Sequence, residues 1–179
     1  MKFLLSLFYI FLIVSNLINP AYSSDIAKGK ELSVSCAACH GDNGISLNPV
    51  WPKLAGQNPK YLASQLYEFR KGAEGNRNNA VMYGIAMTLS DSDIEDLSAY
   101  YASLESKVGL TQDKYLDLGR NIYRGGNMEI KIQACISCHG PNGQGNYAAA
   151  IPMLSGQHSQ YTYQQLKNFQ ASVRSNDYN

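Results

Sequence analysis

The sequence of 179 residues predicts an all-α protein made of two tandem copies of one domain. Cys-x-x-Cys-His occupies residues 36–40 and returns at 135–139, and the segment 51–57 returns as 151–157. A self-similarity of this length is typical of a duplication. Apolar residues recur at helical spacing, and no stretch shows the alternation of a strand. We therefore expect two helical domains, at 24–108 and 109–179.

The first 23 residues differ from the rest. Lys2 precedes an apolar run at 3–18, which is followed by Ala21-Tyr22-Ser23. This pattern is typical of a secretory signal, with cleavage expected after Ser23. A retained N-terminal anchor is the alternative, although the run is shorter than the roughly 20 residues of a membrane-spanning helix. No second apolar span follows, so we expect an exported chain with at most a loose membrane association.

Charge and composition narrow the function classes. Apolar residues make up 45% of the chain, which is typical of a globular protein. The 15 Lys and Arg residues nearly balance the 14 Asp and Glu residues. No basic stripe is interleaved with aromatic residues, so nucleic acid is not an expected partner.

The first domain should begin with a helix that is capped by Asp25 and ends near Leu32. Gly29 lies inside this helix, where glycine costs about 1 kcal/mol relative to alanine. We interpret Gly29 as the point of a close helix crossing. Gly119 holds the same place before the second Cys-x-x-Cys-His motif, so the same role is expected there.

Two more helices are expected in the first domain. Asn58-Pro59 is a helix start, because proline favours the first helical position. Ser90 with Asp93 three residues later resembles a capping box for a closing helix. The apolar face of that helix is formed by Ile94, Leu97, Tyr101 and Leu104.

The two Cys-x-x-Cys-His motifs contain all four cysteines of the chain. This motif is the attachment signature of a c-type haem, in which two thiols bond to the haem edge and the histidine ligates iron. The motifs predict two covalently bound haem c groups, and zinc is disfavoured because 95 residues separate the two pairs of cysteines. The predicted anchors are Cys36, Cys39, Cys135 and Cys138, and the predicted iron ligands are His40 and His139.

Each iron also needs a partner on its distal side. Only one histidine, His158, lies outside the motifs, so two histidine ligands at both irons are not available within the chain. Methionine is the alternative, and Met/His ligation raises the reduction potential. Met82 lies in an expected loop before the closing helix, and Met87 lies closer to its cap. We expect Met82 to be the ligand, with Met87 as the rival.

These residues resemble the cytochrome c4 family of dihaem proteins, with two class I cytochrome c domains. The resemblance is carried by 51–57 (Trp-Pro-Lys-Leu-Ala-Gly-Gln), by 124–126 (Arg-Gly-Gly) and by 154–158 (Leu-Ser-Gly-Gln-His). It implies a periplasmic carrier of single electrons between respiratory-chain partners, with a terminal oxidase as acceptor. It also implies that the Pro52 and Pro152 carbonyls accept hydrogen bonds from the motif histidines, and it favours Met82.

One departure from the family pattern affects the second domain. A second distal methionine is expected near residue 181, and the sequence given ends at Asn179. A counterpart of the closing helix at 90–104 is also absent. Met128, Met153 and His158 are poor substitutes for the ligand. We interpret the sequence as C-terminally incomplete; the rival is a short form with an open second iron.

Two function classes remain. An electron carrier needs axial ligation, burial and hydrogen bonds that set each reduction potential. A dihaem oxidoreductase or peroxidase needs an open iron position with acid–base groups beside it. The first domain offers a methionine ligand and no spare histidine, so we expect an electron carrier rather than an enzyme.

Overall fold

The computed structural model describes residues 23–109 and 113–176, and these residues form helices and loops without a β-sheet. The predicted all-α class is confirmed. The predicted signal falls almost entirely in residues 1–22, outside the described residues. None of the helices in the described ranges is long and apolar enough to cross a membrane.

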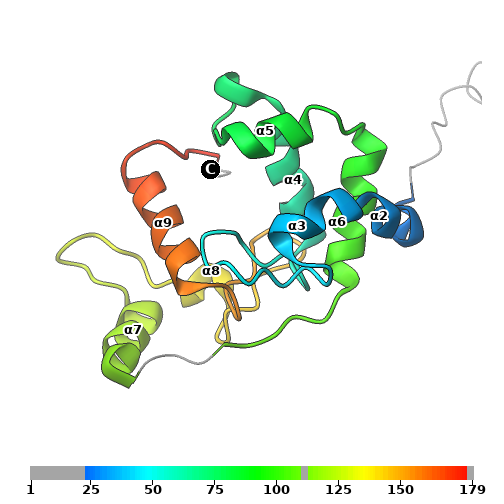
Figure 1. Ribbon diagram of the computed structural model, residues 1–179. Coiled ribbons are helices and arrows are strands. Elements are labelled where there is room, and N and C mark those ends of the chain that lie inside the picture. The colour runs from blue at the N-terminus through cyan, green and yellow to red at the C-terminus, as the bar shows by residue number, and fades with distance from the viewer. Residues whose placement is uncertain (1–22, 110–112, 177–179) are drawn as a thin grey trace, which may run out of the picture.

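The first unit contains α2 to α6 (Figure 1), and the second contains α7 to α9. The helices of the first unit are α2 (Ile26–Leu32), α3 (Val34–His40), α4 (Pro59–Arg70), a short 3₁₀ turn (Gly72–Glu74), α5 (Ala80–Ala86) and α6 (Asp91–Ser103). Those of the second unit are α7 (Asp113–Gly125), α8 (Ile136–His139) and α9 (Ser159–Gln170).

The predicted helix starts of the first unit are confirmed. The Asp25 carboxylate accepts hydrogen bonds from two backbone N–H groups at the start of α2, and Asn58 does the same for α4. The full capping box is present at α6, where Ser90 and Asp93 satisfy each other's backbone N–H groups. These caps satisfy donors that a helix cannot pair internally, which explains why the boundaries were readable from local sequence.

Helix α6 is the central packing surface of the first unit, because α2 and α4 both pack against it. Its apolar side chains Ile94 and Leu97 are 0% and 2% exposed. The predicted close crossing at Gly29 is confirmed: a Cβ there would lie 2.1 Å from the Asp96 carbonyl oxygen. Glycine is required at this crossing because any side chain would collide with the α6 backbone.

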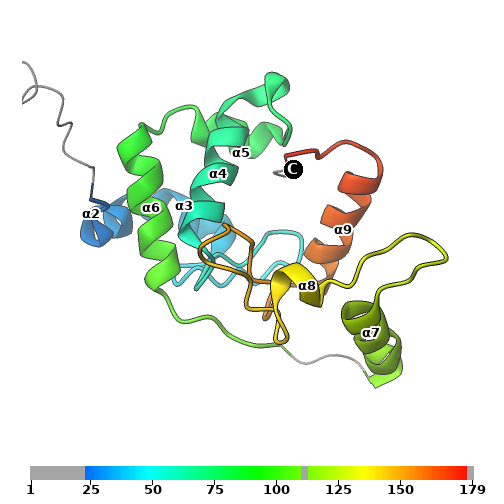
Figure 2. The same cartoon turned by 180° about the vertical axis from the view of Figure 1, so that it is seen from behind.

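Helix α7 stands apart from the other helices in both views (Figures 1 and 2). None of its residues is buried, and Leu118 is 62% exposed. The expected close crossing at Gly119 is wrong for the described residues, since a Cβ there would meet nothing within 4 Å. Among the described residues, no helix packs against α7 in the way that α6 packs against α2.

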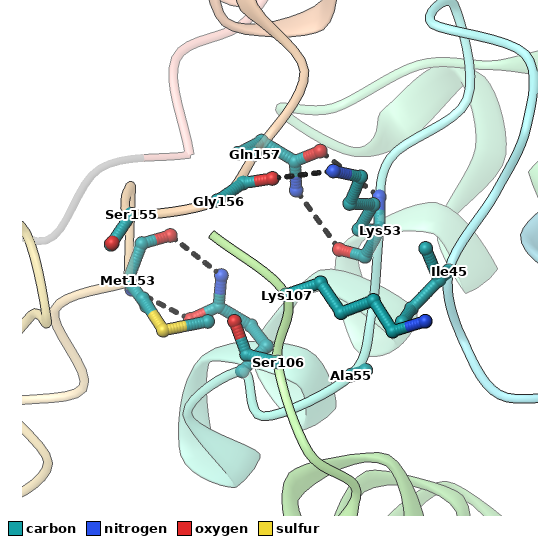
Figure 3. Close-up of a pocket in the computed structure, with 10 residues that line it drawn as sticks. Ile45, Lys53, Ala55, Ser106, Lys107, Met153, Ser155, Gly156 and Gln157 are labelled. Atoms are coloured by element: carbon teal, nitrogen blue, oxygen red, sulfur yellow. Dashed lines mark hydrogen bonds between the residues drawn. The ribbon is translucent and has the colours of Figure 1, made fainter. Parts of the chain in front are cut away.

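The two units meet through the loops that follow their motifs, and the contact is close to two-fold symmetric. Lys53 N–H donates to Gln157 Oε1 (3.0 Å), and Gln157 Nε2 donates to the Lys53 carbonyl (2.9 Å; Figure 3). Met153 and Gln57 make the same pair, at 2.7 and 2.9 Å. Because these residues are equivalent in the repeat, each unit offers the other the same surface.

Candidate functional site

The first motif lies on α3, which ends at its histidine. Cys36 and Cys39 are three residues apart and therefore share one helix face. Both thiols are free and half-buried. Gly41 ends the helix at φ +80°, and a Cβ there would lie 2.5 Å from the carbonyl oxygen of Ile45. This glycine lets the chain turn sharply directly after the histidine.

The imidazole of His40 is held by the backbone of the following loop. Its Nδ1 lies 2.8 Å from the carbonyl oxygen of Pro52. A carbonyl can only accept, so Nδ1 carries the proton and the Nε2 lone pair remains available. His40 is 8% exposed, and burial lowers its pKa against the smaller opposing effect of the Pro52 bond. The imidazole is therefore neutral and held in one orientation, and its Nε2 can act as a metal ligand.

The second motif repeats this arrangement in a more open setting. Cys135 immediately precedes α8 and is half-buried, whereas Cys138 is exposed. His139 Nδ1 lies 2.9 Å from the Pro152 carbonyl oxygen, which fixes the same tautomer as at His40. The hydrogen bonds expected at Pro52 and Pro152 are thus both present.

Met82 lies within α5, so the expectation that it belongs to a loop is wrong. Asn79 caps this helix by accepting a hydrogen bond from the Met82 backbone N–H (3.0 Å). The Met82 side chain is half-buried, while Met87 follows the end of the helix and is 56% exposed. The local cap, which the sequence analysis missed, orders the segment that carries Met82.

His158 serves the contact between the units. Its Nε2 lies 3.0 Å from both the hydroxyl and the carbonyl oxygen of Ser46. The Ser46 hydroxyl donates its own proton to the Trp51 carbonyl (2.7 Å), so His158 Nε2 is the donor in this contact. The nitrogen is engaged across the junction, which is consistent with the low expectation for His158 as an iron ligand.

Both motifs have the donor set that fits a covalently attached haem. Each has two thiols one helical turn apart and a neighbouring imidazole with an available Nε2. In each unit the proline carbonyl accepts a hydrogen bond from Nδ1 of the histidine, which leaves Nε2 unprotonated. Histidines that ligate metals commonly have their second ring nitrogen fixed in this way.

Comparisons with known proteins agree with this chemistry. The family model for cytochrome c matches residues 26–105 and 119–178. Cytochrome c4 of Azotobacter vinelandii is 40% identical over 161 residues, which are 87% of this chain and 77% of the relative. The chain belongs to the cytochrome c4 family. Membership of this family establishes a c-type cytochrome with two covalently bound haem c groups that functions in electron transfer.

The fold agrees as well. The crystal structure of reduced recombinant cytochrome c4 from Pseudomonas stutzeri matches with a TM-score of 0.84 and 38% identity, over 88% of this chain and 86% of that one. Another relative is the thiosulfate dehydrogenase electron acceptor of Thiomonas intermedia, whose name refers to a partner enzyme. It is 38% identical, over 81% of this chain and 67% of the relative.

The polar residues that join the two units were not predicted from the sequence. Gln57 and Gln157 were visible as repeated positions, and so were Tyr61 and Tyr161. Their repetition shows that the positions are equivalent in the two units, but it does not show that the two copies contact each other. The partners lie 84 to 113 residues apart in sequence, so no local pattern could reveal these bonds.

Proposed function

We propose that this protein is a periplasmic dihaem carrier that passes single electrons between respiratory-chain partners and delivers them to a terminal oxidase. The observation that carries the proposal is the pair of motifs in which each histidine is fixed by a proline carbonyl. A rigid ligand reduces the reorganisation that accompanies a change of iron charge. Bound haem supplies a reversible one-electron couple, and the protein sets its potential through ligation, burial and hydrogen bonding.

In this proposal the cysteines hold the haems and the histidines ligate the irons. The anchors are Cys36, Cys39, Cys135 and Cys138, the ligands are His40 and His139, and Pro52 and Pro152 fix the two imidazoles. Met82 would supply the other protein ligand of the first iron. Its half-burial on a capped helix favours it over Met87, which is mostly exposed.

Substitution of Met82 tests the ligand assignment. Met82→Leu should abolish the red absorption band of sulfur-ligated ferric haem and lower one midpoint potential, because Met/His ligation raises it. Met87→Leu is the matched control and should leave both unchanged. A band that survives in Met82→Leu and disappears in Met87→Leu would reverse the assignment.

Stopped-flow mixing tests the direction of electron flow. The reduced holoprotein should be oxidised rapidly by membranes that contain a terminal oxidase, and cyanide should block the reaction. Oxidation by dissolved oxygen at the same rate with and without the membranes would argue against an oxidase as acceptor.

A second candidate is an electron acceptor for a thiosulfate-oxidising enzyme, which the name of the Thiomonas relative favours. Thiosulfate with a thiosulfate dehydrogenase should then reduce the oxidised protein, whereas thiosulfate alone should not. Reduction by thiosulfate alone, or peroxide turnover far above that of free haem, would instead support the oxidoreductase or peroxidase alternative.

A further inference from the structure

Two buried side-chain hydroxyls in the described part of the chain have no hydrogen-bond partner, and one of them belongs to Tyr101. Tyr101 lies on α6 and is 4% exposed. A buried polar group without a partner costs free energy, so each such group needs an explanation. The other hydroxyl is that of Ser98, which can rotate toward a carbonyl of the preceding helical turn. A phenol hydroxyl at the end of a rigid ring has no such choice.

The position of the Tyr101 hydroxyl is fixed by the contacts of its backbone and its ring. The Tyr101 carbonyl accepts a hydrogen bond from the backbone N–H of Gly56 (2.9 Å). The ring packs against Gly44, where a Cβ would lie 3.0 Å from the ring carbon Cδ1. The centroid of the Tyr100 ring lies 5.2 Å from that of Tyr101. The hydroxyl therefore cannot turn toward solvent without disrupting the core of the first unit.

The groups around this hydroxyl belong to the first haem motif and to the residues just before it. Cys36 packs against the buried cluster that contains Tyr101. Burial raises the pKa of Tyr101, with a smaller contribution from Cys36, so the hydroxyl stays protonated and can donate. Ser33 is also close, but its own hydroxyl donates to the Lys30 carbonyl (2.8 Å). Neither Ser33 nor Cys36 completes a hydrogen bond with the phenol. Tyr101 thus holds a fixed donor beside a haem anchor.

The second unit fills the corresponding place differently. Gly143 is the repeat counterpart of Gly44, and a Cβ there would lie 3.6 Å from the hydroxyl of Tyr123. Tyr123 comes from α7, which precedes its motif, whereas Tyr101 comes from a helix that follows its motif. The Tyr123 hydroxyl donates to the Gly140 carbonyl (2.6 Å). Both motifs therefore have a tyrosine beside them, but within the described ranges only the first tyrosine has a hydroxyl without a partner.

The Cys36 sulfur is a thioether in the holoprotein, because its thiol has bonded to the haem edge. A thioether sulfur has no proton to donate and accepts hydrogen bonds weakly. A phenol held beside this sulfur can therefore act only as the donor. Hydrogen bonding around a haem is one of the means by which a protein sets the reduction potential.

We propose that the Tyr101 hydroxyl donates a hydrogen bond to the thioether sulfur of Cys36 and thereby raises the reduction potential of the first haem. The positive end of the O–H dipole disfavours the more positive ferric state, so it stabilises the ferrous state. The inference deepens the proposed function and rests on haem attachment at Cys36, but not on the identity of any electron partner. Tyr101 then distinguishes the first haem from the second.

Redox titration of the holoprotein tests the inference. In Tyr101→Phe the ferrous-to-ferric ratio of one haem should fall about two- to fivefold at fixed potential, or about 20–40 mV for a one-electron couple. The other haem should keep its potential. Tyr100→Phe is the matched control, since Tyr100 precedes Tyr101 on α6 and its hydroxyl is not one of the two buried groups without a partner. Tyr123→Phe should leave unchanged the potential that Tyr101→Phe lowers.

Thermal unfolding of the same holoproteins gives a second readout whose sign decides. A hydroxyl that donates to the sulfur contributes to stability, so Tyr101→Phe should lower the Tm by about 2–4 °C. A hydroxyl that stays unpaired is destabilising, so its removal would instead raise the Tm.

Three results would overturn the proposal. The first is a Tyr101→Phe protein whose two potentials equal those of Tyr100→Phe, and the second is a Tm that rises in Tyr101→Phe. The third is a Ser33→Ala protein that reproduces both effects of Tyr101→Phe, which would assign the acceptor to Ser33.

Intact mass of the denatured samples separates this inference from the proposed function. A mass with two haems and unchanged potentials in Tyr101→Phe refutes the role of Tyr101 alone. A wild-type mass with fewer than two haems refutes attachment at both motifs, and the proposed function fails with it. Neither measurement uses an electron partner, so the assignment of the oxidase is tested independently.

Discussion

Helices α2 and α7 hold the same place in the two units, before the two haem motifs, yet only one of them is packed. In α2, Gly29 lies against the α6 backbone at Asp96 and beside Tyr100, which belongs to the buried apolar cluster of the first unit. In α7, Gly119 has open space, and Leu116 and Leu118 are 41% and 62% exposed. The comparison shows that an apolar helix face and a crossing glycine give no burial unless a second helix is present.

The two units differ in the packing of α2 and α7, but they are equivalent at the junction, where the loops that follow the two motifs meet. Gln57 and Gln157 bond to the backbone at each other's repeat-related loops. Backbone groups recognised by side-chain amides tolerate different side chains at the partner position, which is why Lys53 and Met153 occupy equivalent places.

The largest expected difference between the units concerns their apolar side chains. Ile94→Ala should lower the free energy of unfolding by about 2–5 kcal/mol, because Ile94 is 0% exposed and a cavity would remain. Leu166→Ala should cost less than about 0.5 kcal/mol, because Leu166 is 64% exposed. Denaturant unfolding followed by far-UV circular dichroism measures both, and similar losses would contradict the comparison.

The two glycines should respond with opposite sign. Gly29→Ala should destabilise the protein by about 1–3 kcal/mol, since its Cβ would collide with the Asp96 carbonyl. Gly119→Ala should be neutral or stabilise by up to about 1 kcal/mol, because alanine is the better helix former in open space. Thermal unfolding of both holoproteins measures this, and a loss at Gly119 would mean that a further element packs on α7.

The junction glutamines should respond equally. Gln57→Ala and Gln157→Ala each remove an amide that bonds to two backbone groups across the junction. A loss of about 1–3 kcal/mol is expected in each, from the backbone groups left unpaired. Unequal losses in denaturant titrations, or a loss in only one variant, would contradict the two-fold equivalence. Gln164→Ala, whose amide bonds within α9, is the control.

The smallest expected effect is a pH-dependent one at the α6 cap. The hydroxyl and backbone N–H of Ser90 donate to the Asp93 carboxylate and lower its pKa. This stabilisation is present above about pH 4 and is lost as the pH falls through the lower folded-state pKa. Ser90→Ala should lose about 1 kcal/mol at neutral pH and less at acid pH. Parallel denaturation curves at both pH values measure this, and a loss that is independent of pH would contradict the role of Asp93.

Local features of the site were predictable because their causes lie within a few residues. The spacing of Cys36, Cys39 and His40 predicts the haem anchors, and the caps at Asp25, Asn58 and Ser90 predict the helix starts. The placement of Met82 was predicted wrongly, as a loop, because the Asn79 cap of the short helix α5 was not recognised. The ligand role of Met82 stays a prediction that Met82→Leu can test, and the ligand roles of His40 and His139 stay predictions as well.

The sequence by itself determined the duplication, the two haem c groups, the helical class and most helix starts, since thiol spacing, repeat length and capping are local chemistry. Tertiary structure decided which helix faces are buried, which partner His158 has, and which groups surround the Tyr101 hydroxyl. These outcomes depend on residues far apart in the sequence. Burial and hydrogen bonding between distant residues are properties of surfaces brought together, so only the assembled fold assigns them.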